Sequence, residues 1–107
     1  MSFQGGVRVA SYTVSKSAVM GITRLLANEW AQNGINVNAI APGYMATNNT
    51  DALRASEFRN QEILARIPAG SWGEPADVMG PVVFLASAVA DYINGYTIAV
   101  DGGWLAR

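Results

Sequence analysis

The chain has 107 residues, of which 50% are apolar and 14% are charged, and its net charge is −1. A domain of this size buries only about two-thirds of its unfolded surface, so a thin core is expected. Ordinary soluble domains are about 25% charged, so the low charge of this chain indicates apolar faces that another surface covers. The charge balance excludes an electrostatic footprint for nucleic acid, and the absence of Cys and His excludes disulfides, thiol chemistry, imidazole bases and the usual zinc sites.

The first predicted element is a helix over about residues 11–33, preceded by a loop around Gly5 and Gly6. Ser11 is its expected N-cap and Gly34 its C-terminal stop. Four large apolar residues recur along it at three- and four-residue steps, so one broad face is expected to pack into a core. These residues are Val19, Ile22, Leu26 and Trp30.

A short strand and a segment of mixed character are predicted next. Apolar residues alternate over about residues 35–41, which is typical of a strand, and the turn Pro42-Gly43 ends it. The segment over about residues 44–68 begins as a polar loop and continues as a weakly periodic helix that Pro68 ends.

A helix over about residues 75–88 and a last strand over about residues 96–101 complete the chain. Pro75 suits a first helical position, whereas Pro81 should kink the helix. Asp101 is expected to form a turn at the end of the last strand rather than to act as a catalyst.

This order of elements predicts an α/β fold. Strands separated by helices normally pair in parallel, but two strands do not make a stable doubly wound sheet. All 107 residues are therefore expected to form the C-terminal portion of a single domain with a doubly wound parallel, Rossmann-like sheet, incomplete without N-terminal strands.

Tyr12 and Lys16, the only lysine, carry the most informative chemistry. Four residues apart on a helix, their side chains share one face. A positive charge close to a phenol favours the phenolate, so Tyr12 can exchange a proton with a hydroxyl or carbonyl oxygen. This suits oxidation of an alcohol by hydride transfer to a nicotinamide ring. Alone the spacing is a weak signal, because it also arises by chance.

Further motifs follow this helix in a fixed order. They are Ala39-Ile40-Ala41-Pro42-Gly43, then Thr47, then Val82-Val83-Phe84-Leu85-Ala86-Ser87, then Val100-Asp101-Gly102-Gly103. The series resembles the short-chain dehydrogenase/reductase family from end to end. More narrowly, Asn28-Glu29-Trp30, the run from Ala39 to Thr50 and the ending from Asp101 to Arg107 resemble members that act on sugar acids.

The resemblance implies roles for six residues. Tyr12 would be the catalytic acid/base and Lys16 its partner, and both would contact the cofactor. The Pro42-Gly43 turn and the backbone around Met45 would meet the nicotinamide carboxamide, and Thr47 would add a hydroxyl contact. This agrees with the rule that ligands of open parallel sheets lie outside the carboxyl ends of the strands.

The resemblance also implies a substrate, a cofactor and an assembly. The reaction would interconvert a hydroxyl and a ketone on a sugar acid of the 2-keto-3-deoxygluconate type, with NAD as cofactor and NADP not excluded. Arg54, Arg59 and Arg66 lie in the segment that closes over substrate in the family, and an arginine fork matches a carboxylate, although for any one of them a solvated surface position is the more frequent role. A homo-oligomer, a tetramer by resemblance, is expected.

The sequence also departs from the family pattern. No glycine-rich turn for a dinucleotide pyrophosphate occurs in these 107 residues, Ser2 lies too close to Tyr12 to be the family's catalytic serine, and Ser71 stands where many relatives carry arginine. We therefore expect a fragment of a dehydrogenase that is inactive by itself. Two alternatives stay open: a module that associates with itself or with a full-length dehydrogenase, and a small independent α/β domain with a fortuitous Tyr-Lys pair.

A cytoplasmic protein without membrane or metal partners is expected. No stretch reaches the roughly 18 uncharged apolar residues that a membrane span requires, and residues 1–8 contain no apolar signal-peptide core.

Overall fold

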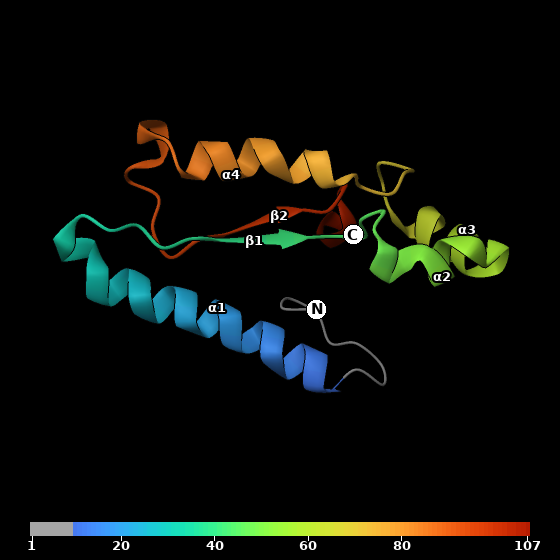
Figure 1. Ribbon diagram of the computed structural model, residues 1–107, viewed down its shortest axis with the longest axis horizontal. Coiled ribbons are helices and arrows are strands. Elements are labelled where there is room, and N and C mark those ends of the chain that lie inside the picture. Colours follow the sequence, from blue (N-terminus) through green and yellow to red (C-terminus); the bar gives the residue numbers. More distant parts are fainter. Residues whose placement is uncertain (1–9) are drawn as a thin grey trace. The chain divides into compact units, whose positions relative to one another are not determined.

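The computed structural model describes residues 10–107 (Figure 1), so the loop expected around residues 5–6 lies outside the described part. The chain divides into two compact units. Unit 1 combines the residues up to Ala39 with Leu85–Ile98, and unit 2 combines Ile40–Phe84 with Ala99–Arg107. None of the described helices is both long enough and apolar enough to cross a membrane.

The two strands pair in parallel, as the sequence predicts. Strand β1, Ala39–Pro42, lies beside β2, Thr97–Val100 (Figure 1). The Ala39 amide donates to the Tyr96 carbonyl at 2.9 Å, and at the other end the Gly43 amide donates to the Val100 carbonyl, also at 2.9 Å. Since helices precede both strands, the expected α/β class is confirmed.

Strand β1 begins several residues later than the predicted start near residue 35, because asparagine side chains replace the backbone ladder there. Asn36 Nδ2 donates to the Asp91 carbonyl and Asn38 Nδ2 to the Ile93 carbonyl, both at 2.8 Å. Side-chain amides that bond to a neighbouring backbone compete with regular strand pairing. Residues 35–38 are thus held to the segment before β2 without being part of the sheet.

Helix α1, Ala10–Trp30, packs through small residues rather than through its apolar stripe. Thr23 and Ala27 are 4% and 6% exposed, and a Cβ on Gly95 would lie only 3.3 Å from the Ala27 Cβ. The small side chains allow this close approach of the segment before β2. The predicted stripe is mostly uncovered: Val19, Ile22 and Trp30 are 50%, 56% and 40% exposed, and Leu26 is half-buried. The prediction that this stripe packs into a core is wrong within the described residues.

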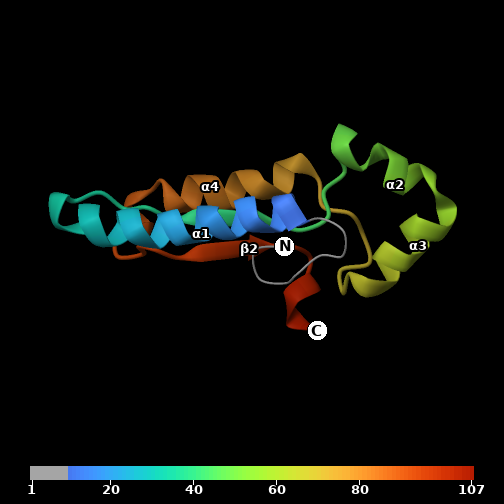
Figure 2. The same ribbon diagram turned by 90° about the horizontal axis from the view of Figure 1, so that it is seen from below.

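The segment after β1 folds into two helices where the sequence suggests one. Helix α2, Asp51–Ala55, and helix α3, Glu57–Arg66, meet at a sharp bend (Figure 2). The break is at Ser56, whose extended backbone, φ −86° and ψ 107°, ends α2 and precedes α3. Helix α3 ends before Ile67, which is also extended because it precedes Pro68.

Pro81 lies near the start of a helix, whereas the sequence predicts it in a helix interior. A 3-10 turn over Pro75–Val78 precedes helix α4, Met79–Leu85, so Pro81 is the third residue of α4. The first amides of a helix have no intrahelical acceptor, and the missing N–H of proline is harmless there.

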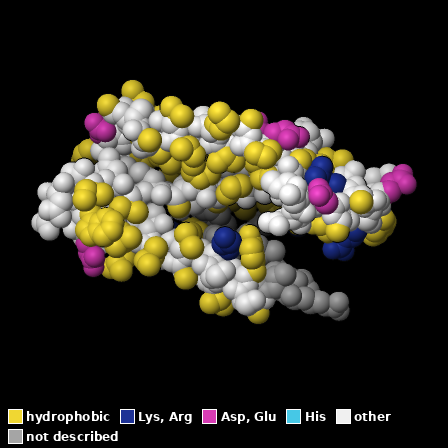
Figure 3. All heavy atoms as spheres, in the orientation of Figure 1, with side chains coloured by type: hydrophobic (Ala, Val, Ile, Leu, Met, Phe, Trp, Pro, Cys, Tyr) yellow, Lys and Arg dark blue, Asp and Glu magenta, His cyan; other side chains and the backbone are white. Residues whose placement is uncertain are grey.

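The interior is small, as the composition predicts. The hydrophobic residues buried among residues 10–107 are Ala27, Ile67 and Ala90. Hydrophobic side chains are displayed along α4, including those of Met79 and Val83, whereas charged side chains gather over α2 and α3 (Figure 3). Much apolar surface is therefore uncovered in the described chain.

Candidate functional site

Tyr12 and Lys16 lie together near the start of α1 in unit 1. The Lys16 ammonium nitrogen is 5.3 Å from the centroid of the Tyr12 ring. The four-residue spacing places both side chains on one face of the helix. Tyr12 is 50% exposed, so its hydroxyl is accessible to a ligand. The structure thus brings together the predicted acid/base and its cationic partner.

The turn Pro42-Gly43 lies at the carboxyl end of β1, where the sequence predicts a ligand loop. A Cβ on Gly43 would lie 2.6 Å from the Asp101 Cα and 2.8 Å from its Cβ. No larger residue fits at this distance, since carbon atoms pack at about 3.5–4.0 Å. The glycine is required by the close approach of the chain that follows β2.

Beyond this turn, the backbone around Met45 is held by a short parallel bridge to Gly73. The Ala46 amide donates to the Gly73 carbonyl at 2.7 Å, and the Gly73 amide donates to the Tyr44 carbonyl at 2.9 Å. A Cβ on Gly73 would lie 2.6 Å from the Met45 sulfur. The predicted cofactor loop is therefore an ordered segment with its own pairing partner.

Two side chains that follow this loop in sequence bond to its backbone. The Thr50 hydroxyl oxygen lies 2.7 Å from the Met45 carbonyl and 2.9 Å from the Thr47 carbonyl, and it accepts from the Thr47 amide at 3.1 Å. Arg54 forms an ion pair with Asp51 and donates through Nη2 to the Thr47 carbonyl at 3.4 Å. Sequence reasoning missed Thr50 and Asp51; the three-residue spacing from Thr47 to Thr50 was the available signal.

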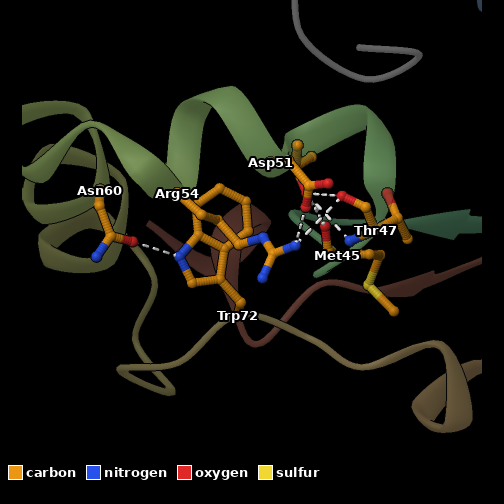
Figure 4. Close-up of polar contacts among 7 residues, drawn as sticks. Met45, Thr47, Asp51, Arg54, Asn60 and Trp72 are labelled. Carbon is orange, nitrogen blue, oxygen red and sulfur yellow. Dashed lines mark hydrogen bonds and ion pairs between the residues drawn. The ribbon is translucent and has the colours of Figure 1, made fainter.

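An aromatic cluster joins this loop to other parts of unit 2. The Tyr44 ring meets the Trp72 ring edge to face at 5.5 Å and the Trp104 ring at 4.8 Å between centroids. Trp72 Nε1 donates to Asn60 Oδ1 on α3 at 2.7 Å (Figure 4). The Arg66 guanidinium carbon lies 4.0 Å from the centroid of the Trp104 ring. Trp72 and Trp104 are thus both packed against other side chains of unit 2.

A cavity of about 240 Å³ lies beside this cluster within unit 2. It is lined by residues that follow β1 and β2 and by the segment that carries Trp72. Among them are Tyr44, Met45, Trp72, Gly73, Asp101 and Gly102. Asp101 accepts from the Gly103 amide at 2.9 Å and from the Leu105 amide at 3.1 Å, so its carboxylate shapes the turn as predicted.

The three predicted substrate arginines have different surroundings. Arg54 is half-buried and paired with Asp51, and Arg66 is exposed but stacked on Trp104. Arg59 on α3 is exposed. Among residues 10–107, no group of three or more His, Cys, Asp or Glu side chains is placed to hold a metal ion.

The predicted site residues fall into both units. Tyr12 and Lys16 belong to unit 1, and the predicted residues from Pro42 to Arg66 belong to unit 2. The Tyr-x-x-x-Lys helix and the parallel pair of strands are the features by which the chain resembles a class of nicotinamide-dependent oxidoreductases.

Comparison with known proteins establishes the family. Residues 2–105 match the family model described as enoyl-(acyl carrier protein) reductase, and the chain belongs to the short-chain dehydrogenase/reductase family. It is 76% identical over 107 residues to the 2-dehydro-3-deoxy-D-gluconate 5-dehydrogenase of Escherichia coli strain K12 and 77% identical to that of Dickeya dadantii strain 3937. The matches cover 100% of this chain but only 42% of each of these relatives.

A solved structure agrees with these relatives. It is that of a candidate 2-deoxy-D-gluconate 3-dehydrogenase from Agrobacterium tumefaciens with bound NADP. The match covers 99% of this chain and 43% of the other, with 66% identity and a TM-score of 0.96. The described chain therefore has the Rossmann-like architecture of this family over the part that it spans.

Proposed function

We propose that these 107 residues supply the acid/base part of an NAD(P)-dependent oxidoreductase that interconverts a hydroxyl and a ketone on a sugar acid. The observation that carries this proposal is the pairing of Tyr12 and Lys16 on one face of α1, 5.3 Å from ammonium to ring. The identity to two 2-dehydro-3-deoxy-D-gluconate 5-dehydrogenases supports a substrate of the 2-keto-3-deoxygluconate type.

Tyr12 handles the proton in both directions of this reaction. In oxidation its phenolate accepts the proton of the substrate hydroxyl, and in reduction its hydroxyl donates a proton to the carbonyl oxygen. Lys16 places a positive charge 5.3 Å from the centroid of the Tyr12 ring, and the half-exposed side chain of Tyr12 is open to substrate. The nicotinamide, when bound, supplies the hydride acceptor or donor.

The donor groups of the chain fit the nicotinamide end of the cofactor. A phenol, an ammonium and the Thr47 hydroxyl suit the uncharged ribose hydroxyls, and the backbone around Met45 suits a carboxamide. These residues contain no glycine-rich turn for the pyrophosphate. They also do not contain the segment that distinguishes NAD from NADP, which follows the second strand of a complete dinucleotide-binding fold. These residues therefore account for the nicotinamide end only, with either cofactor.

We assign the binding of the substrate carboxylate to an arginine of helices α2 and α3. Arg59 on α3 is exposed, and its planar guanidinium can form a bidentate contact with a carboxylate. Arg54 and Arg66 are engaged with Asp51 and Trp104, so we assign them to the structure of the loop and its surroundings.

Two proteins test the proposal. The first is the 107-residue chain alone, and the second is a chimera in which the chain replaces its matching segment of the E. coli relative, to which it is 76% identical. With NAD or NADP and 2-dehydro-3-deoxy-D-gluconate, we expect no change in nicotinamide absorbance for the chain alone and steady turnover for the chimera. Robust turnover by the chain alone contradicts its dependence on a pyrophosphate-binding part. A folded chimera without turnover contradicts the catalytic assignment.

A second candidate function is association with another copy or with a full-length dehydrogenase. The exposed apolar side chains of α1 favour it, since large exposed apolar patches commonly mark interfaces. They include Val14, Val19, Ile22 and Leu25, each at least half exposed. Light scattering of the chain should show a homo-oligomer, and a tetramer is the size that the family resemblance suggests. A monomer that binds no hydrophobic dye would contradict association.

A further inference from the structure

Besides its bridge to Gly73, the backbone from Met45 to Thr47 is held by side chains that come after it in sequence. Thr47 is extended, with φ −135° and ψ 170°, and it begins the 3-10 turn Asn48–Thr50 that leads into α2. The partly buried Thr50 hydroxyl reaches back to the Met45 and Thr47 carbonyls at 2.7 and 2.9 Å and accepts from the Thr47 amide. A hydroxyl has one hydrogen, so it donates to one carbonyl at a time while accepting from the amide. One side chain thus restrains both ends of the Met45–Thr47 backbone.

Arg54 adds a second restraint one turn further along. Its ion pair with Asp51 fixes the guanidinium, and Nη2 reaches the Thr47 carbonyl at 3.4 Å, a long hydrogen bond (Figure 4). Its Nε atom is buried without a hydrogen-bond partner among the described residues. Burying an unsatisfied donor costs free energy, so the position of this side chain is maintained by its other contacts. Arg59, by contrast, is exposed.

We infer that Thr50 and Arg54 are positioning residues for the cofactor loop, which deepens the proposed function and rests on it. Neither residue is assigned a contact with cofactor or substrate. Thr50 acts through the backbone of Met45 and Thr47, and Arg54 acts through the Thr47 carbonyl. They hold this backbone in the conformation in which it would meet the nicotinamide carboxamide. Thr50 is the stronger of the two, because its contacts are shorter and more numerous.

Hydrogen exchange of the 107-residue chain tests the restraint without any turnover. Replacing Thr50 by Val keeps the shape and removes the hydroxyl, so the amides from Met45 to Thr50 should exchange about tenfold faster, the factor expected for one lost hydrogen bond. Thr50→Ser, which keeps the hydroxyl, should restore slow exchange. Asn49→Ala is the matched control, since Asn49 is exposed in the same turn. Unchanged exchange in Thr50→Val would overturn the inference.

Kinetics of the chimera test the consequence for the cofactor. Thr50→Val should raise the KM for the nicotinamide cofactor about tenfold and leave the KM for the sugar acid unchanged, because only the cofactor loop loses its restraint. Arg54→Met should have a smaller effect of the same kind, about threefold, and Arg54→Lys should restore part of it.

The outcomes separate this inference from the proposed function. A chimera that loses turnover with Tyr12→Phe but keeps its cofactor KM with Thr50→Val supports the function and overturns the positioning role. An Arg54→Met variant that raises the KM for the sugar acid instead makes Arg54 a substrate ligand and contradicts its assignment. If the parent chimera has no turnover, the proposed function fails, and the exchange experiment alone decides whether Thr50 restrains the loop.

Discussion

The start of α1 and the loop from Met45 to Arg54 are organised by different means. Tyr12 and Lys16 come together through the regular spacing of a helix, and the phenol is half exposed. The loop is part of no helix or named strand over Met45 to Thr47. Its backbone pairs with Gly73 at Met45 and is further restrained by the Thr50 hydroxyl and the Arg54 guanidinium. The spacing of two side chains on a helix face is kept when many other surface residues are substituted. The conformation of the Met45–Thr47 backbone, in contrast, depends on a few specific side chains. The two regions should therefore respond differently to substitution.

The largest effect is expected at Lys16. In the chimera, Lys16→Met should lower kcat about a thousandfold, roughly 4 kcal/mol of transition-state stabilisation, because the positive charge beside the Tyr12 ring is removed. Methionine is a good helix former, so the thermal midpoint should hardly change. Arg24→Met, at an exposed position of the same helix, is the control and should keep its activity. A kcat within tenfold of the parent would remove Lys16 from the acid/base pair.

A smaller effect, on stability, is expected at the entrance to the loop. Gly43→Ala places a Cβ 2.6 Å from the Asp101 Cα, so the backbone must shift at a cost of about 2–3 kcal/mol in the free energy of unfolding. Urea unfolding of the 107-residue chain followed by tryptophan fluorescence measures this cost. Gly21→Ala is the matched control, because no atom lies within 4 Å of a Cβ there, and it should stabilise α1 by about 0.5–1 kcal/mol. Equal effects at the two glycines would contradict the close approach.

The smallest effect is expected where the chain leaves β2. Asp101→Ala removes two acceptors, those for the Gly103 and Leu105 amides, and should cost about 1–2 kcal/mol in the same unfolding experiment. Asp101→Asn keeps one acceptor oxygen and should lose roughly half as much. If the two variants are equally destabilised, the carboxylate has some role other than accepting from both amides.

Much of the regular structure could be predicted, because its signals are local. The helical spacing of Tyr12 and Lys16 needs no distant residue, and the helix-strand order predicts parallel pairing. The late start of β1 could not be predicted, since it depends on Asn36 and Asn38 bonding to residues more than fifty positions away. The packing face of α1 was missed for a similar reason.

The loop shows the same limit on a shorter scale. Thr47 was predicted as a cofactor contact from the resemblance, but the roles of Thr50 and Arg54 depend on backbone angles that no periodic pattern encodes. The extended conformation of Ser56, which separates α2 from α3, could likewise not be predicted, because the residues on both sides of it favour a helix. The apolar composition correctly predicted that apolar surface is exposed. It did not predict which face of α1 carries the exposed apolar side chains.

Steady-state turnover of the Tyr12→Phe chimera is the most direct test of the central claim. Phenylalanine keeps the ring that lies beside Lys16 and removes only the hydroxyl that carries the proton. We predict a loss of about a thousandfold in kcat, with a loss of cofactor affinity, measured by NADH or NADPH fluorescence, of no more than about tenfold, the effect of one lost hydrogen bond to the ribose. Retention of kcat within tenfold would contradict the assignment of Tyr12 as the acid/base and, with it, the function proposed for this chain.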